Sequence, residues 1–393
     1  MDAAAQQRGP SRLLIAVIAV ATAVIVANLY YAQPLIGAMA PDLGISPDMA
    51  GSVTSVTQIG YGLGLFLLVS LADLVEHRRL VLIQLLCTAA ALTGVGLSRT
   101  APVYYAAAFL VGLFTTGAQV LLPYIAQLVP EQRRGRVVGT VMAGLLTGLM
   151  LARPVALFIS ASLGWRAVFG LAALVMLVLA AVLARLMPRH QPLGGLHYGQ
   201  ILFSSLRVLR ELPAVRRRAL YQTLMFGGFC LFWTAAPLAL AVRFGLHERG
   251  MALFALAGAG GALVAPWAGH LADAGLTRAC TTAAMAVLGL SFLASRWLVA
   301  AGLLAAFALV AVLLDAAVQM NHVVSQRVIY TSPAGIRGRV NAIYMTVAFV
   351  GGAAGSMLGA LTYHRGGWGA TAWTGAAIGA VLLVLQATER SGI

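Results

Sequence analysis

The sequence predicts an all-α membrane protein with twelve transmembrane helices, arranged as two parallel repeats of six helices each. Three observations predict this fold class. Hydrophobic residues make up 61% of the 393 residues and only 9% are charged, whereas soluble proteins carry roughly 25% charged residues. The apolar residues form runs long enough to cross a bilayer. Short motifs also recur along the chain at a spacing of about 200 residues.

The expected spans are the stretches nearly free of charge, because a spanning helix needs about 20 mostly apolar residues. Only two of them contain a charge, Arg153 in the fifth and Asp315 in the tenth. We expect the first stretch to remain as a helix, because its apolar core is longer than that of a cleaved signal peptide. The twelve stretches are 13–41, 49–72, 80–98, 100–130, 137–165, 167–184, 219–242, 250–272, 279–295, 297–326, 340–364 and 366–388.

The positions of the arginines predict the orientation. All 26 basic residues are Arg, and the net charge is +15. An even number of spans places both termini on one side, and the loops on that side hold about three times as many Arg as the opposite loops. We therefore expect both termini in the cytoplasm. Basic loops beside anionic lipid account for the charge, so we expect no nucleic-acid partner.

Internal repeats predict two equivalent halves. The pattern Pro-x-x-x-Arg-Gly-Arg-Val at 130–137 recurs at 333–340, and Gly164-Trp165 recurs as Gly367-Trp368. With six helices in each half, the two copies share one orientation and are parallel repeats.

The repeat divides the chain into an N-terminal bundle at 1–187, a linker at 188–215 and a C-terminal bundle at 216–393. Leucines between 202 and 212 have helical spacing with Arg between them. This spacing favours a basic amphipathic helix on the inner membrane surface. A flexible linker is the alternative.

Two motifs carry a family resemblance. The motif Gly269-His270-Leu271-Ala272-Asp273 and its degenerate first copy, Leu71-Ala72-Asp73, occupy the loops after the second span of each half. With Leu29–Pro34 and Gly164-Trp165-Arg166, they make the whole chain resemble the major facilitator superfamily. The match is to bacterial proton-driven permeases of the drug and arabinose efflux group.

The resemblance implies a secondary active transporter that works by alternating access and exports a small organic solute or drug in exchange for protons. It implies a small-molecule substrate, a surrounding bilayer, a monomer and no cofactor other than the coupling proton. A proton symporter or facilitator for sugar-like solutes is the first alternative. A lipid-handling protein or membrane-embedded enzyme is the second, but no catalytic dyad or metal-ligand cluster has suitable spacing, so we expect no enzyme.

Three residues are the candidates for proton coupling. A charge in mid-membrane costs about 2.5–3.5 kcal/mol or more, so Asp315 and Arg153 mark a functional site or a paired charge. His322 lies on the same helix face as Asp315 and has a side chain that titrates near neutral pH. The alternatives are a permanent ion pair between Asp315 and Arg153, and a structural role for His322.

Polar and aromatic side chains at helical spacing are the candidates for a substrate cavity, because polar groups in lipid must face protein or water. Their alternative role is to hydrogen-bond neighbouring helices. The candidates are Asn28, Tyr31, Gln33, Gln58, Gln119, Gln222, Phe226, Trp233 and Gln319.

The loop motifs imply, by resemblance, a latch that closes the cytoplasmic side. Its residues are Asp73, Arg78, Arg136, Asp273 and Arg339; positive charge that only fixes topology is the alternative.

Small residues in two spans predict close helix contacts. Gly144 and Gly148 in the fifth span, and the glycines between 351 and 359 in the eleventh, allow close approach of helices. We expect these helices at the interface between the halves.

Overall fold

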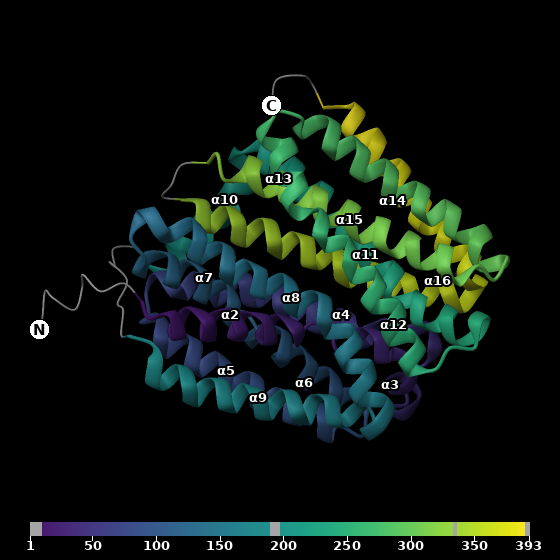
Figure 1. Ribbon diagram of the computed structural model, residues 1–393, viewed down its shortest axis with the longest axis horizontal. Helices are drawn as coiled ribbons and strands as arrows, with labels where there is room; N and C mark the ends of the chain where they lie inside the picture. The colour runs from purple at the N-terminus through teal and green to yellow at the C-terminus, as the bar shows by residue number, and fades with distance from the viewer. Residues whose placement is uncertain (1–9, 189–196, 333–335, 390–393) are drawn as a thin grey trace, which may run out of the picture.

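The described part of the computed structural model covers residues 10–188, 197–332 and 336–389, and its regular secondary structure is entirely helical (Figure 1). A few side chains inside these ranges, including that of Asp73, lie outside the described part. The prediction of an all-α fold is confirmed.

The N-terminal half consists of α2 to α9. Its helices are α2 (Arg12–Ala27), η1 (Gln33–Leu35), α3 (Ile36–Asp42), η2 (Pro47–Met49), α4 (Ser52–Leu67), η3 (Val69–Asp73), α5 (His77–Leu97), α6 (Ala101–Phe114), α7 (Gly117–Leu128), α8 (Glu131–Leu163) and α9 (Trp165–Leu186).

The C-terminal half consists of α11 to α16 and follows the helix α10. These helices are α10 (Tyr198–Glu211), α11 (Pro213–Phe244), α12 (Glu248–Ala259), η4 (Gly260–Val264), α13 (Ala265–Asp273), α14 (Thr277–Ala300), α15 (Leu304–Ile329) and α16 (Arg337–Ala387). The leucine-rich segment between the halves forms α10, which packs against α11 and α16.

The helices are consistent with twelve membrane spans. Among the described residues, nine helical segments are long and apolar enough to cross a bilayer. One of these, α16, has 51 residues and contains two expected spans, separated by non-helical backbone at Gly366 and Gly367. The first expected span is divided into α2 and α3, and the eighth into α12 and α13.

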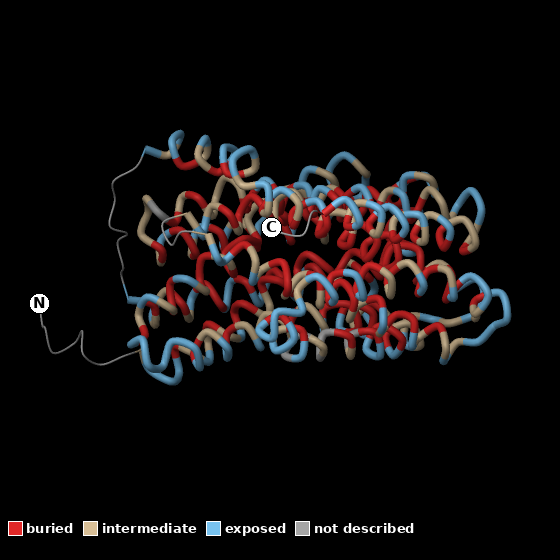
Figure 2. Tube along the Cα trace, turned by 90° about the horizontal axis from the view of Figure 1, so that it is seen from above, coloured by how far each residue is buried: buried red, intermediate tan, exposed pale blue. Residues whose placement is uncertain are grey.

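The two halves form two layers with their buried residues concentrated in the middle. Figure 1 shows the N-terminal half below the C-terminal half, and Figure 2 shows burial greatest along the centre of the bundle. Within the halves, α2 packs on α8 and α11 packs on α16; between them, α4 packs on α16 and α8 packs on α12. These inter-half contacts surround the centre of the molecule.

The glycine motifs make close helix crossings inside each half. A Cβ on Gly148 would lie 2.0 Å from the backbone oxygen of Ala23 on α2, and a Cβ on Gly355 would lie 2.0 Å from that of Gly227 on α11. The helices that carry these glycines also lie at the interface between the halves, as expected, because α8 packs on α12 and α16 packs on α4. Within each half, the absence of a side chain lets the fifth and eleventh spans touch the first and seventh, so the repeat extends to the packing.

A prediction follows for α8, which has tightly packed and open glycines on one helix. Gly148→Ala should lower the stability of the purified protein by about 1–3 kcal/mol, because the added methyl meets backbone that cannot move aside. Gly139→Ala is the matched control, since nothing lies within 4 Å of a Cβ there and Ala favours the helix. Thermal unfolding in detergent measures both. Equal melting temperatures for the two variants would contradict the packing.

An ion pair connects α3 to the start of α9. The Asp42 carboxylate accepts a hydrogen bond from Trp165 Nε1 at 2.9 Å and forms an ion pair with Arg166. The Arg166 guanidinium and the indole N–H hold the pKa of Asp42 below its usual range. Asp42 lies at the end of the bundle away from the termini, just beyond the first expected span.

A pH dependence follows from the lowered pKa of Asp42. Its ionised form is favoured by folding, so its contribution to stability is present above the unfolded pKa of about 3.9 and is lost as pH falls through the lower folded pKa. Asp42→Asn should therefore lower the melting temperature at neutral pH. The difference from wild type should shrink in acid below about pH 4. A difference that is constant across this range would show that the charge of Asp42 is not involved.

Candidate functional site

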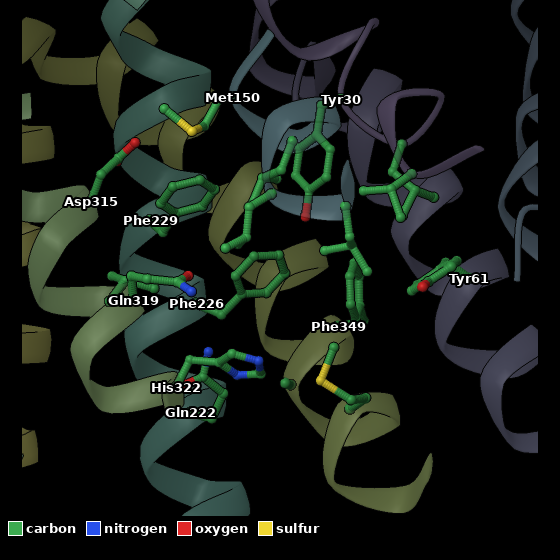
Figure 3. Close-up of a pocket in the computed structure, with 18 of the residues that line it drawn as sticks. Tyr30, Tyr61, Met150, Gln222, Phe226, Phe229, Asp315, Gln319, His322 and Phe349 are labelled. Atoms are coloured by element: carbon green, nitrogen blue, oxygen red, sulfur yellow. The ribbon is translucent and has the colours of Figure 1, made fainter. Parts of the chain in front are cut away.

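A cavity of about 150 Å³ lies between the two halves (Figure 3). Its wall is formed by α2 and the segment after it, α4, α7, α8, α11, α15 and α16, so both halves contribute. The lining residues are Val26, Leu29, Tyr30, Tyr61, Gln119, Met142, Leu145, Leu146, Leu149, Met150, Arg153, Gln222, Phe226, Phe229, Asp315, Val318, Gln319, His322, Met345, Ala348 and Phe349.

The polar side of the cavity is a stripe on α15. Asp315, Gln319 and His322 lie one above another on this helix and face the cavity (Figure 3). Their helical spacing is the pattern by which the sequence predicts an inward-facing stripe. The next residue of the stripe, Gln326, instead donates a hydrogen bond to Asn341 Oδ1 at 2.9 Å.

Arg153 is buried in the wall opposite this stripe. Its guanidinium carbon lies 4.6 Å from the ring centre of Trp233, 4.9 Å from that of Phe229 and 5.1 Å from that of Tyr30. Its Nε donates a hydrogen bond to Gln33 Oε1 at 3.0 Å. The faces of aromatic rings attract a cation, so these rings stabilise a charge that lipid and apolar protein disfavour.

Asp315 is held by Trp233 rather than by Arg153. Its Oδ1 accepts a hydrogen bond from Trp233 Nε1 at 2.8 Å. Among the ion pairs within 4 Å in the described part of the chain, none joins Asp315 to Arg153. The alternative of a direct ion pair is therefore wrong for this state, because the Trp233 ring contacts both groups and its N–H occupies a carboxylate oxygen. The two charges still interact through space.

The segment η4, which interrupts the eighth span between α12 and α13, packs against Asp315. A Cβ on Gly261 in η4 would lie 2.7 Å from the Asp315 Cβ, and one on Gly258 would lie 2.7 Å from the Trp233 ring. Larger residues at these two positions would push on α15 at Asp315 and on the indole that binds its carboxylate. The glycines of α12 and η4 thus allow the Trp233–Asp315 pair to form.

His322 has a polar contact behind the cavity surface. Its Nδ1 lies 3.3 Å from the hydroxyl oxygen of Tyr344 on α16, and the two rings are stacked. This contact fits either the relay role or the structural role expected for this histidine.

Four of the nine expected cavity residues line the cavity, namely Gln119, Gln222, Phe226 and Gln319. Gln222 and Gln119 also bond to other side chains, so they have both expected roles. Gln222 Oε1 accepts a hydrogen bond from Asn321 Nδ2 at 2.8 Å, and Gln119 Nε2 lies 3.4 Å from the Tyr61 hydroxyl.

The other five are corrected by the structure, because packing behind the cavity wall formed by the described residues removes them from it. Asn28 donates to the Met176 sulfur at 3.5 Å, and Gln58 donates to the Cys230 sulfur at 3.2 Å across the halves. Gln33 accepts from Arg153, Trp233 donates to Asp315, and Tyr31 is buried in the apolar core.

Sequence reasoning missed much of the apolar wall. Tyr30, Phe229 and Phe349 line the cavity, and none was among the expected residues. Phe229 lies three residues after Phe226 on the same helix face, which could have identified it. Phe349 has no such signal, because apolar residues surround it on every face of its helix.

The two halves touch closely at the end of the bundle away from the termini. There Ser55 Oγ donates to the Ala353 carbonyl oxygen at 2.7 Å, and Ser160 Oγ bonds to Glu248 Oε1 at 2.8 Å. At the end with the termini, the first turns of α8 and most of α13 are exposed. The cavity wall on α8, α11 and α16 begins about two to three helical turns from the start of each helix at that end.

The expected latch residues that are described bind within their own half or α10. Asp273 forms an ion pair with Arg327 on α15, and Arg78 donates to the Ala184 carbonyl oxygen on α9. Arg339 donates to Ser204 Oγ on α10 at 3.0 Å, and Arg136 is exposed. Among the described residues, Asp273 contacts neither Arg136 nor Arg339 in this state, and α13 is not packed against α8 at this end.

A helical membrane bundle of two halves around a central cavity defines a transporter architecture, and comparisons with known proteins agree. Residues 18–324 match the family model described as Major Facilitator Superfamily. An uncharacterized transporter of Escherichia coli O157:H7, YgaY, is 38% identical over 376 residues, or 95% of each chain. A probable transporter of Streptomyces coelicolor, SCO4007, is 34% identical over 92% of this chain and 85% of its own.

A solved structure supports the same fold. The D-xylose–proton symporter superposes with a TM-score of 0.74 at 15% identity, covering 95% of this chain and 97% of the other. The chain belongs to the Major Facilitator Superfamily. It is a multi-pass membrane transporter of small molecules.

The Trp233–Asp315 hydrogen bond gives a prediction. Trp233→Phe keeps an aromatic ring beside Arg153 but removes the N–H that Asp315 accepts, so stability should fall by about 1.5–3 kcal/mol, the range for hydrogen bonds to charged groups. Thermal unfolding in detergent measures the loss. Trp297→Phe is the control, because Trp297 is 54% exposed. An unchanged melting temperature for Trp233→Phe would show that the bond does not stabilise the bundle.

Proposed function

We propose that this transporter is proton-coupled and that Asp315 carries the coupling proton. The observation that supports the proposal is a partly buried carboxylate facing the cavity between the halves, with no ion-pair partner within 4 Å among the described residues. A carboxylate that ionises there leaves a charge in the membrane interior, at a cost of about 2.5–3.5 kcal/mol or more. Gaining and losing a proton therefore changes the energy of the site strongly.

Alternating access is the mechanism by which the proton and solute would cross. The halves meet at the end away from the termini and separate around α8 and α13 at the other end. Rocking the halves about the cavity would open the end away from the termini and close the end with the termini, as in other transporters built from repeats. The latch residues Asp73, Arg78, Arg136, Asp273 and Arg339 would meet when the termini end closes.

Arg153 and His322 are proposed to assist Asp315. The positive charge of Arg153 favours the ionised carboxylate, and this effect weakens as the distance grows. Rocking changes that distance because Arg153 and Asp315 lie in different halves. His322 lies on the same helix face as Asp315, about two turns closer to the end with the termini. It would pass the proton toward that end.

The family resemblance supports a bacterial inner-membrane monomer with cytoplasmic termini, using protons and no other cofactor. It also supports export of a small organic solute or drug by exchange with protons. Symport or facilitated transport of sugar-like solutes is the alternative. In this orientation the cavity would face the cytoplasm, where an exporter loads its substrate.

Proteoliposomes test this proposal. A solute that raises the melting temperature of the purified protein is added to vesicles, and an internal pH dye records proton movement while labelled solute is followed. Asp315→Asn should abolish proton movement but retain exchange of solute, because Asn cannot carry a proton. Glu211→Gln is the control, since it changes an exposed carboxylate on α10. Full proton coupling in Asp315→Asn would overturn the proposed role of Asp315.

A further inference from the structure

Arg153 has hydrogen-bonding capacity that the described residues do not satisfy. Its Nε is bound to Gln33, but its Nη2 is buried without a hydrogen-bond partner in the structure. The side chain is 4% exposed and belongs to the cavity wall. A buried cationic donor without an acceptor is unfavourable, so an acceptor entering the cavity would stabilise it.

No carboxylate in contact neutralises this guanidinium. The one acidic residue among the lining residues is Asp315, and it is bound to Trp233 rather than to Arg153. The rings of Trp233, Phe229 and Tyr30 surround the charge but offer no acceptor comparable to a carboxylate. Arg153 is therefore a cation held in place by aromatic rings and by Gln33, with a buried Nη2 that has no acceptor among the described residues.

The rest of the cavity suits a small apolar body beside this cation. Phe226, Phe229 and Phe349 face the space below Tyr30 (Figure 3). A volume of about 150 Å³ is comparable to an engineered cavity that holds a benzene molecule. Arginine presents paired N–H donors that match the geometry of a carboxylate.

We propose that Arg153 binds the anionic group of the transported solute, and that the substrates are small organic acids of about one aromatic ring whose apolar part packs against Phe226, Phe229 and Phe349. This inference rests on the proposed transport function and adds a substrate class to it. It gives Arg153 direct contact with the solute in addition to its effect on Asp315.

Protonation of Asp315 should then raise the affinity of Arg153 for an anion. Ionised Asp315 and a bound carboxylate would place two negative charges around one Arg153, whereas protonated Asp315 leaves the guanidinium for the solute. The other titratable groups around Arg153 and Asp315 are Tyr30 and Cys230, which interact with Arg153, and Tyr61 and His322, which line the same cavity. None of these four supplies a fixed positive charge at neutral pH in place of Arg153.

The linkage is reciprocal, so the anion raises proton affinity as the proton raises anion affinity. The proton and anion would therefore bind the same conformation together. For this class of solute the linkage favours transport of both in one direction, which is the symport alternative left open by the sequence.

The test compares acids with their neutral amides on the purified full-length protein. Calorimetry and thermal shift are measured with acetate, benzoate and 1-naphthoate, and with acetamide, benzamide and 1-naphthamide. The acids remain mostly ionised at about pH 6 and at about pH 8, because carboxyl groups have pKa values of about 4. Benzoate should bind better than benzamide, and better at the lower pH with uptake of protons. Equal binding of acids and amides, or binding of none of the acids, would overturn the proposal.

Variants identify the group responsible. Arg153→Gln should weaken benzoate binding by about tenfold or more and leave weak amide binding unchanged, and Arg153→Lys should restore part of the acid preference. Arg207→Gln, at an exposed position on α10, is the charge-matched control. Asp315→Asn should bind benzoate equally at both pH values and without proton uptake. Retention of acid preference in Arg153→Gln with a wild-type melting temperature would overturn the assignment.

The failure of this inference differs from failure of the proposed function. Benzoate binding that depends on Arg153 but produces no flux in proteoliposomes would support the anion site and contradict proton-coupled transport. Proton-coupled flux of a neutral or cationic solute that persists in Arg153→Gln would support transport and overturn the anion site.

Discussion

Two opposite charges between the halves, the buried Arg153 and the partly buried Asp315, impose the constraint on which the centre of this structure depends. Neither charge reaches bulk water easily, and each must be stabilised by groups in the protein. The indole of Trp233 contacts both, with its ring near the guanidinium and its N–H bonded to the carboxylate. The glycines at 258 and 261 leave room for this arrangement. The charges are thus close enough to interact but are not locked as an ion pair.

The packing of each half is compatible with a moving interface. Close glycine crossings join the fifth span to the first and the eleventh to the seventh, inside the halves. A crossing in which backbones touch through missing side chains resists sliding, because any shift brings bulky atoms together. The contacts between the halves include side-chain hydrogen bonds such as Ser55 to Ala353 and Ser160 to Glu248, and a close approach of Gly51 to the backbone of Ser356. Such contacts can be broken and replaced by water as the halves rock.

The sequence predicted the parts of the site that depend on one helix. Asp315, Gln319 and His322 share a face because helical geometry fixes their spacing, and lipid requires that face to turn inward. Five expected cavity residues, including Asn28 and Gln58, failed for a different reason. A polar side chain in a membrane helix can satisfy its hydrogen bonds with a neighbouring helix as well as with a cavity, and spacing along one helix does not distinguish the two.

By itself the sequence determined the all-helical membrane fold, its two repeats and the two charges within spans, because these follow from hydropathy, motif spacing and the cost of charge in lipid. The tertiary structure decided which groups those charges contact. It placed Trp233 between Arg153 and Asp315, paired Asp273 with Arg327 and left one side of Arg153 without an acceptor. These features require side chains from distant helices to meet at distances of a few ångströms. Periodicity in one segment contains no information about that approach.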